Sequence, residues 1–189
     1  MSEAAPRQTL QQRVSAAILD GAASAFAARG EQANMNDVAA AAGVARATVY
    51  RYFPNRQALL DELARVALSD AEALLAAARI DEVAPEEGVA RAVRALVDVG
   101  DSFVLLARER SDREHFERSI SRPLRELFER GQDAGDIRTD IGSAHLTDSL
   151  IGMVVGVLTS TPALGKEDMI ATITGLFLGG ATARGPRPQ

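Results

Sequence analysis

The chain has 189 residues, 47% of them hydrophobic, which is enough to bury a core in one medium domain or in two smaller ones. It contains no cysteine, so disulfides, thiolate metal sites and cysteine nucleophiles are excluded. The net charge of -5 is uneven, because residues 1–56 carry six Arg against four acids whereas residues 57–189 carry fifteen basic residues against twenty-two acids. There is no apolar run long enough to span a bilayer and no signal-peptide pattern, so we expect a cytoplasmic protein without a membrane partner.

Abundant Ala, Leu, Arg and Glu, with apolar residues at helical spacing, predict an all-α fold. Thr9 is placed to cap a first helix that Gly30 ends, and Asn34 is placed to cap a second helix with Asp37 in its first turn. Pro54 breaks the third helix. We expect about nine helices in all, at approximately residues 9–29, 35–42, 46–53, 56–79, 86–109, 111–119, 122–133, 141–159 and 166–181.

These helices are expected to form two domains. Residues 9–55 are assigned to an N-terminal three-helix domain with a helix-turn-helix. Residues 56–181 are assigned to a C-terminal helical domain, with the helix at 56–79 connecting the two. The stretch IDEVAP at residues 80–85 interrupts the helical pattern and is a candidate boundary.

The segment NMNDVAAAAGVARATVYRYFPNRQALL, residues 34–60, is the most informative part of the chain. A helix-turn-helix needs a small residue where its helices approach, which Ala39 supplies, and a residue of positive φ in the turn, which Gly43 supplies. Val49 and Phe53 are spaced to point inward. The step of the helix then turns Ala47 and Arg51 outward and leaves polar or hydroxyl-bearing side chains beside them, as a recognition helix requires.

The chemistry of the outward residues suggests their roles. Arg51 can reach guanine O6 and N7, and Thr48 can donate to a phosphate or contact a thymine methyl. Tyr50 and Tyr52 can donate their hydroxyls to phosphates. Any one of these residues could be an ordinary surface residue, but the whole ordered set argues against chance. The predicted DNA-binding residues are Asn34, Arg46, Ala47, Thr48, Tyr50, Arg51, Tyr52 and Arg56.

Residues 13–60 resemble the DNA-binding domain of TetR-family transcriptional regulators. The resemblance rests on Ile18, Phe26 and Gly30 in the first helix, on DVAAAAGVARATVYRYF, and on PNRQALL at the start of the fourth. It implies that the third helix is the recognition helix and that Tyr50 and Tyr52 contact phosphates. Arg46-Ala47 stands where the family often has a small polar residue followed by Gly, and Asn34 stands where Thr or Ser is usual. Arg46 therefore adds a possible contact.

The resemblance also implies that the C-terminal helices form a dimer and bind a small molecule. The helix at 141–159 contains glycines that are unfavourable within a helix unless another helix approaches closely, and the last helix has more apolar residues than one core-facing stripe needs. The alternative is that both helices are simply the core of one subunit. The predicted dimer-interface residues are Gly152, Gly156, Ile170, Ile173 and Phe177.

Large apolar residues and the two histidines of the C-terminal helices are the candidates for a ligand pocket. Each histidine could orient a ligand, although a surface or structural role is the commoner one. The sequence does not identify the effector. The predicted pocket residues are Phe103, Leu106, His115, Phe116, Leu124, Phe128, His145 and Met153.

The function that fits these features is a ligand-responsive, dimeric repressor that a small molecule releases from a palindromic DNA operator. An enzyme is disfavoured, because the chain has no glycine-rich phosphate loop and no nucleophile elbow. We therefore expect no catalytic residues, no metal and no cofactor. The alternative function is a helical interaction protein of the same fold that has lost specific DNA binding.

Overall fold

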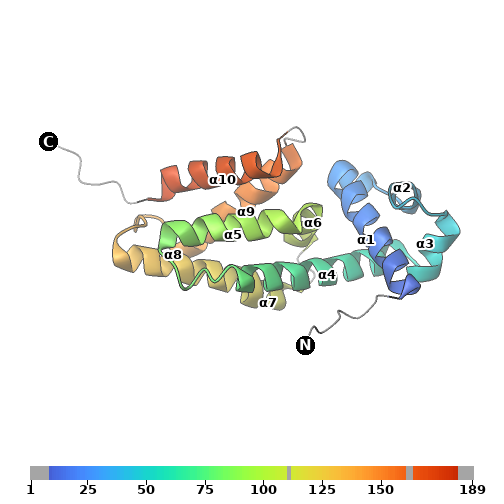
Figure 1. Cartoon of the computed structure of the whole chain (residues 1–189), viewed down its shortest axis with the longest axis horizontal. Helices are drawn as coiled ribbons and strands as arrows, with labels where there is room; N and C mark the ends of the chain where they lie inside the picture. The colour runs from blue at the N-terminus through green and yellow to red at the C-terminus, as the bar shows by residue number, and fades with distance from the viewer. Residues whose placement is uncertain (1–8, 110–111, 161–163, 183–189) are drawn as a thin grey trace, which may run out of the picture. The chain divides into compact units, whose positions relative to one another are not determined.

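The computed structural model describes residues 9–109, 112–160 and 164–182. Every regular element in these residues is a helix, apart from an isolated bridge between Ile137 and Thr182, so the predicted all-α fold is confirmed. The chain forms two compact units, Met1–Leu63 and Ala64–Gln189. The division falls inside the helix α4, Arg56–Ala77, which begins in the first unit and ends in the second (Figure 1). No helix of the described chain is long and apolar enough to cross a membrane.

The N-terminal unit contains α1 (Leu10–Arg29), η1 (Gly30–Gln32), α2 (Met35–Ala41), α3 (Arg46–Tyr52) and the start of α4. Thr9 caps α1 through a reciprocal capping box with Gln12, as its position predicts. The helices enclose a small core whose largest fully buried side chains include Ile18 and Leu59. This core orients α2 and α3, which pack directly against each other.

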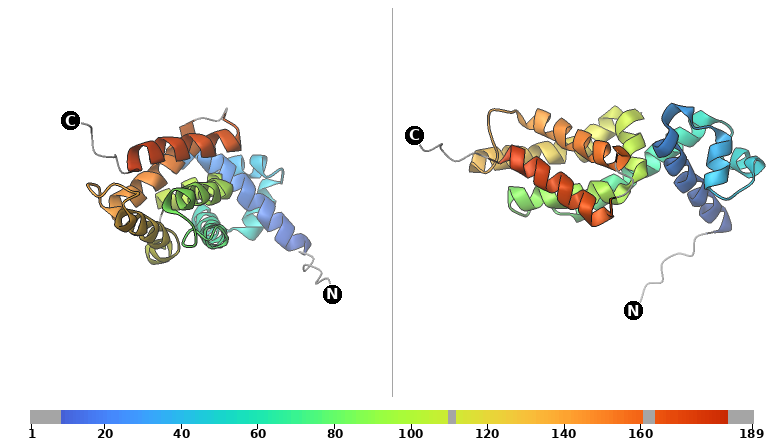
Figure 2. Two further views of the ribbon diagram at one scale, coloured as in Figure 1. Left: turned by 60° about the vertical axis from the view of Figure 1, so that its left-hand side comes forward. Right: turned by 90° about the horizontal axis from the view of Figure 1, so that it is seen from above.

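The C-terminal unit contains the rest of α4 and six further α-helices joined by one π-helical segment. Its helix α5 packs against α8 and α10, and α9 packs against α6, α8 and α10. Figure 2 shows α10 beside α9 and α5. The rings of Phe128 and Phe177 meet in the core, with centroids 5.5 Å apart. The elements are α5 (Pro85–Val99), α6 (Asp101–Glu109), α7 (Arg113–Phe116), the π-helix η2 (Glu117–Ser121), α8 (Arg122–Ala134), α9 (Ser143–Ser160) and α10 (Lys166–Ala181).

Two of the expected helix boundaries are wrong. The helix expected over residues 86–109 is divided into α5 and α6 at Gly100, whose φ of +67° a helix cannot accommodate. The break expected between residues 119 and 122 does not occur, because η2 joins α7 to α8. Pro123 has no N–H to donate to the preceding turn, and a π-helical segment at this point is compatible with that loss.

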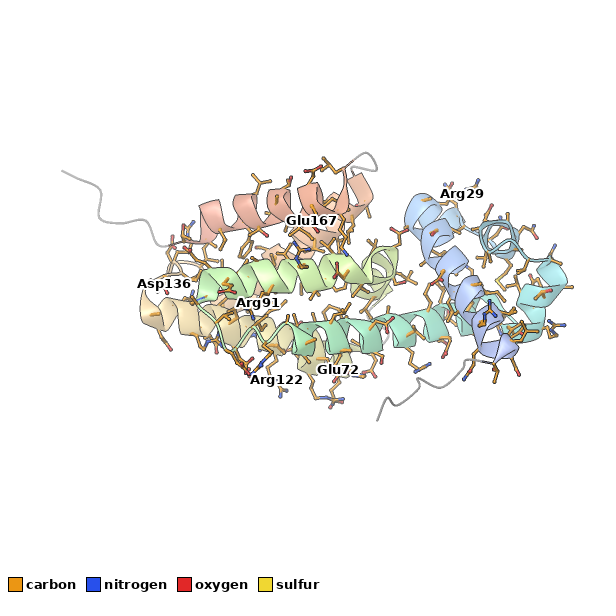
Figure 3. All side chains as sticks on the ribbon, viewed as in Figure 1. Arg29, Glu72, Arg91, Arg122, Asp136 and Glu167 are labelled. Carbon is orange, nitrogen blue, oxygen red and sulfur yellow. The ribbon has the colours of Figure 1, made fainter. Side chains whose placement is uncertain are left out.

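Ion pairs link α5 to α10 at the surface of the C-terminal unit. Arg94 on α5 forms a bidentate pair with Glu167 on α10, with both N–O distances 2.7 Å, and Figure 3 shows Glu167 on the side of α10 that faces α5. Lys166 pairs with Asp98 at 2.5 Å. These contacts fix the start of α10 on α5, although exposed pairs of this kind each contribute only about 0–1 kcal/mol.

Candidate nucleic-acid interface

The turn between α2 and α3 has the geometry that a helix-turn-helix requires. Gly43 has a φ of +66°, so the chain reverses there without steric strain. The N–H of Val44 donates to the carbonyl of Ala39 at 3.0 Å and closes the turn. Ala39 is buried where α2 ends, as its small side chain predicts. The local sequence therefore fixes the direction in which α3 leaves α2.

Asn34 begins α2 as a reciprocal cap. Its side-chain oxygen accepts from the N–H groups of Asn36 at 2.8 Å and Asp37 at 3.4 Å, while the Asp37 carboxylate accepts from the Asn34 N–H at 3.0 Å. Asp37 also pairs with Arg29 at 2.5 Å, which connects the end of α1 to α2. The side-chain oxygen of Asn34 is thus used within the fold, and only its amide N–H groups remain to serve as donors to a phosphate.

One face of α3 is buried and the other is exposed. Val49 is completely buried and Phe53 nearly so, which fixes the rotation of the helix about its own axis. Arg46, Ala47 and Arg51 are exposed, as the inward assignment of Val49 and Phe53 predicts. Tyr50 is 39% exposed although it is a large aromatic residue. The predicted reading face of α3, which also includes the half-buried Thr48 and Tyr52, is therefore open to a partner in this unit.

Cation–π contacts hold the tyrosines of α3 in place. The guanidinium of Arg46 lies 5.3 Å from the centre of the Tyr50 ring and also donates to its hydroxyl at 3.4 Å. The guanidinium of Arg51 lies 5.4 Å from the centre of the Tyr52 ring. Such contacts are worth about 0.5–1 kcal/mol at exposed sites. Each arginine places positive charge beside a tyrosine side chain, an arrangement suited to binding phosphate oxygens.

Arg56 has a structural contact that its predicted role did not include. Its guanidinium lies 4.9 Å from the centre of the Phe26 ring, so the start of α4 rests on α1. Asn55, to which the sequence analysis gave no role, caps α4 by accepting from the N–H of Ala58 at 2.8 Å. An Asn directly before a helical stretch was the available signal for that role.

Gly21 is a second residue that sequence reasoning missed. A Cβ atom built on Gly21 would lie 2.6 Å from the backbone nitrogen of Ala42, so α1 can pass the end of α2 only because this position has no side chain. A glycine inside an otherwise regular helix was the signal. Gly21 therefore sets the distance between α1 and the helix-turn-helix.

The residues predicted for a ligand pocket occupy three kinds of position. Five of them are almost completely buried in the apolar core of the C-terminal unit and Met153 packs against that core, while His145 is exposed at the start of α9. Among the described residues, His115 lies on the wall of a cavity with a volume of about 570 Å³. The five core residues are Phe103, Leu106, Phe116, Leu124 and Phe128.

This cavity, called here the α4–α8 cavity, lies between the end of α4 and the α7–η2–α8 segment. His115 Nε2 lies 3.0 Å from an oxygen of Glu72, a bond that connects α7 to α4. Figure 3 labels Glu72 on α4. The hydrogen bond with His115 lowers the pKa of the Glu72 carboxyl. The cavity is lined by Glu72, Leu75, Ala76, Ile80, Asp81, His115, Arg118, Ser119, Pro123, Glu126 and Arg130.

The residues predicted for a dimer interface also divide. Ile170, Ile173 and Phe177 are buried within the subunit, where they form the inner side of α10. Gly152 and Gly156 lie on the exposed side of α9, and a Cβ atom at either would have no heavy atom within 4 Å among the described residues. On α10, Leu176 is 64% exposed. Of the residues predicted for a dimer interface, Gly152 and Gly156 are therefore the ones that lie at the surface of the subunit.

Comparison with known proteins relates this geometry to a family. Residues 18–63 match the family model of bacterial regulatory proteins of the tetR family. That segment runs from the core of α1 through α2 and α3 into α4, and it includes every residue of the α3 reading face. No curated protein sequence matches the chain at a significant level.

Solved structures match over nearly the whole chain. The TetR-like transcriptional regulator LfrR from Mycobacterium smegmatis, in complex with proflavine, has a TM-score of 0.71 at 24% identity over 91% of this chain and 98% of its own. The ketosteroid transcriptional regulator KstR2 of Mycobacterium tuberculosis has a TM-score of 0.72 at 18% identity, over 93% and 98%. AibR, in complex with isovaleryl coenzyme A and operator DNA, has a TM-score of 0.67 at 20% identity, over 86% and 97%.

These likenesses show that both units have the fold of TetR-like regulators. The helix-turn-helix itself carries the sequence match, and it is the part in which the reading face of α3 is exposed. Residues 18–63 are therefore similar in sequence to bacterial regulatory proteins of the tetR family, and the chain as a whole is similar in fold to TetR-like regulators.

Proposed function

We propose that the chain is a ligand-responsive, dimeric transcription regulator, and specifically a repressor that a small molecule releases from a palindromic operator. The observation that carries the proposal is the α3 reading face: a short helix fixed by Val49 and Phe53 whose opposite side presents arginine, tyrosine and small residues. Such a face matches the dimensions and chemistry of the DNA major groove.

The proposed contacts divide into base readout and phosphate contacts. Arg51 reads a guanine, and Ala47 and Thr48 are small enough to approach thymine methyl groups. Tyr50, with Arg46 stacked on its ring, and Tyr52, with Arg51 stacked on its ring, bind phosphates on either side. Arg56 and the amide of Asn34 are further proposed phosphate donors at the starts of α4 and α2.

The proposed dimer uses the exposed sides of α9 and α10. The open space above Gly152 and Gly156 allows a helix of a second copy to approach closely, and the exposed Leu176 supplies apolar area. Ile170, Ile173 and Phe177 support this face from within the subunit. A symmetric dimer would present two recognition helices, and binding to a palindrome requires them to lie about 34–36 Å apart, one turn of DNA.

A ligand of the C-terminal unit can act on DNA binding only if it favours one conformation over another. The helix α4 provides the physical connection, because the helix that carries Glu72 on the cavity wall begins at Arg56. LfrR was solved with proflavine and AibR with both isovaleryl coenzyme A and operator DNA, which supports the same division of labour for this chain.

The test is a selection of bound duplexes from a random DNA library with the purified full-length protein. The proposal predicts an enriched palindrome, bound by a dimer, with an affinity that falls steeply as salt rises because phosphate contacts release counterions. Arg51→Ala should weaken the enrichment and relax the preference at one base pair of the half-site, whereas Arg122→Ala, which changes an exposed arginine of α8, should leave the enriched sequence unchanged. Absence of enrichment by the wild-type protein would instead favour the helical interaction protein that has lost DNA binding.

A further inference from the structure

The α4–α8 cavity has more negative than positive groups on its wall. Glu72, Asp81 and Glu126 contribute three carboxylates, and Arg118 and Arg130 contribute two guanidinium groups. Both guanidinium groups are already engaged. Arg118 pairs at 2.5 Å with Glu114, which is outside the lining, and Arg130 donates at 2.8 Å to the carbonyl of Ile80.

Two of the carboxylates are available to a ligand. Within the described chain, Asp81 and Glu126 have no hydrogen-bond or ion-pair partner, whereas Glu72 is bonded to His115. Since the two guanidinium groups of the lining are bonded to other groups, an incoming positive charge would provide these two carboxylates with an ion-pair partner, and an incoming negative charge would be repelled by all three carboxylates. The charge distribution therefore favours a cation over an anion.

The end of α4 adds to this preference independently of the side chains. Leu75, Ala76 and Ile80 place the cavity at the C-terminal end of that helix, where the backbone carries a partial negative charge. The last turn of α4 itself contains no basic residue. Arg91 and Arg130 donate to the carbonyls of Ala78 and Ile80, which lie just beyond the helix.

The remaining lining describes the body of the ligand. Leu75, Ala76, Ile80 and Pro123 form an apolar surface, and the described lining contains neither Phe nor Tyr. With no Phe or Tyr ring to stack on, a flat aromatic cation gains less here than in an aromatic cage, whereas an alkyl chain can bury its methylene groups at about 0.8 kcal/mol each. A volume of about 570 Å³ is within the usual range for small-molecule sites.

We propose that the α4–α8 cavity binds a small aliphatic amine in its protonated form, with its nitrogen between Asp81 and Glu126 and its alkyl chain against Leu75, Ile80 and Pro123. Taken together with the proposed function, on which this second step rests, the amine is the effector. An ammonium group that also approaches Glu72 competes with His115 for the same carboxylate. Binding then loosens the contact between α4 and α7.

The π-helix η2 fits this role. It lies directly after α7 and places Arg118 and Ser119 on the cavity wall. Segments of π-helix are costly for stability and occur frequently at functional sites. In this chain η2 adjoins both the cavity and the Glu72–His115 bond, so a shift of α7 has a deformable segment to absorb it.

The test measures binding calorimetrically on the purified full-length protein without DNA. The probes are n-hexylamine, n-hexanol and hexanoate, which share an alkyl chain and differ in charge, together with 1,6-diaminohexane. The proposal expects one of the two amines to bind, and hexanoate and hexanol to bind at least tenfold more weakly than that amine. Asp81→Asn and Glu126→Gln should each weaken amine binding by about fivefold, the loss typical of one exposed ion pair. Asp133→Asn, an exposed acid of α8 outside the cavity, is the matched control and should change nothing.

The site is overturned if neither amine binds at millimolar concentration, if hexanoate binds as well as the amine that binds more tightly, or if the two cavity variants bind that amine like Asp133→Asn. Affinity for the selected duplex is then measured with and without the amine. Amine binding that leaves DNA affinity unchanged overturns the effector role but not the site. Absence of DNA binding altogether counts against the proposed function and leaves the calorimetric result standing.

Discussion

The clearest test of the helix-turn-helix geometry is Gly21→Ala, a change that adds one methyl group. The new Cβ would lie 2.6 Å from the backbone nitrogen of Ala42 and 2.8 Å from its Cα and Cβ atoms, where ordinary contact begins at 3.4 Å. The atoms in the way belong mainly to the backbone, so no side chain can rotate to make room. Either α1 or the end of α2 has to move by about 1 Å.

Two opposing terms set the magnitude. Alanine is favoured over glycine within a helix by about 1 kcal/mol, which alone would stabilise α1. Overpacking of a close contact costs about 1–3 kcal/mol, and a clash with backbone belongs at the upper end of that range. The expected net loss is therefore about 1–2 kcal/mol, which would lower Tm by roughly 2–8 °C for a chain of this size.

The assay is urea unfolding followed by far-UV circular dichroism, together with affinity for the selected duplex at fixed salt. Ala16→Gly, at an exposed position in the interior of the same helix, calibrates the propensity term and should cost about 1 kcal/mol. Because α2 positions α3, Gly21→Ala should also weaken DNA binding, whereas Ala16→Gly should not. A Gly21→Ala protein as stable as the wild type would refute the close approach of α1 to α2.

Three further predictions concern single side chains. Arg51→Ala should cost about 1–3 kcal/mol in DNA binding and relax the sequence preference at one base pair, whereas Tyr52→Phe should weaken binding to all duplex sequences alike. If Arg51→Ala also weakened binding to all sequences equally, a base-reading role for Arg51 would be refuted. The hydrogen bond with His115 lowers the pKa of Glu72 in the folded chain, so the ionised carboxylate stabilises the fold. The wild type should therefore be more stable than Glu72→Gln by its full margin above pH 4.5, and this margin should disappear as the pH falls below 4.5. A margin that does not change with pH in urea titrations would contradict the prediction. Burial raises the pKa of Asp101 above 3.8, so its charged form is disfavoured in the folded chain. Asp101→Asn should therefore stabilise the chain at pH 7, and the gain should fade as the pH falls through the raised pKa towards 3.8 and be absent below it; a loss of stability at pH 7 would show that the charge is compensated.

The sequence by itself determined the parts of this protein that depend on neighbouring residues. The cap at Asn34, the turn at Gly43 and the inward positions of Val49 and Phe53 all involve contacts within one short segment, and the structure has them as predicted. The roles of Arg51 and the tyrosines in DNA binding remain predictions. Local sequence is sufficient here because a two-helix motif leaves few other ways to bury its apolar residues.

Only the tertiary structure decided how the C-terminal helices share their apolar surface. An apolar stripe shows that one side of a helix is buried but not against what, so the sequence could not tell whether Phe103 and Phe128 line a cavity or fill the core, nor whether Ile173 faces a partner or its own subunit.

The α4–α8 cavity could not be predicted from the sequence for the same reason. Its key pair, Glu72 and His115, is separated by 43 residues, and neither residue has a local pattern that points to the other. Gly21 depends equally on a remote contact, because only the packing of α1 on α2 shows what a side chain there would meet. Contacts between distant segments are set by the packing of the whole fold, so they cannot be predicted from the spacing of residues along the chain.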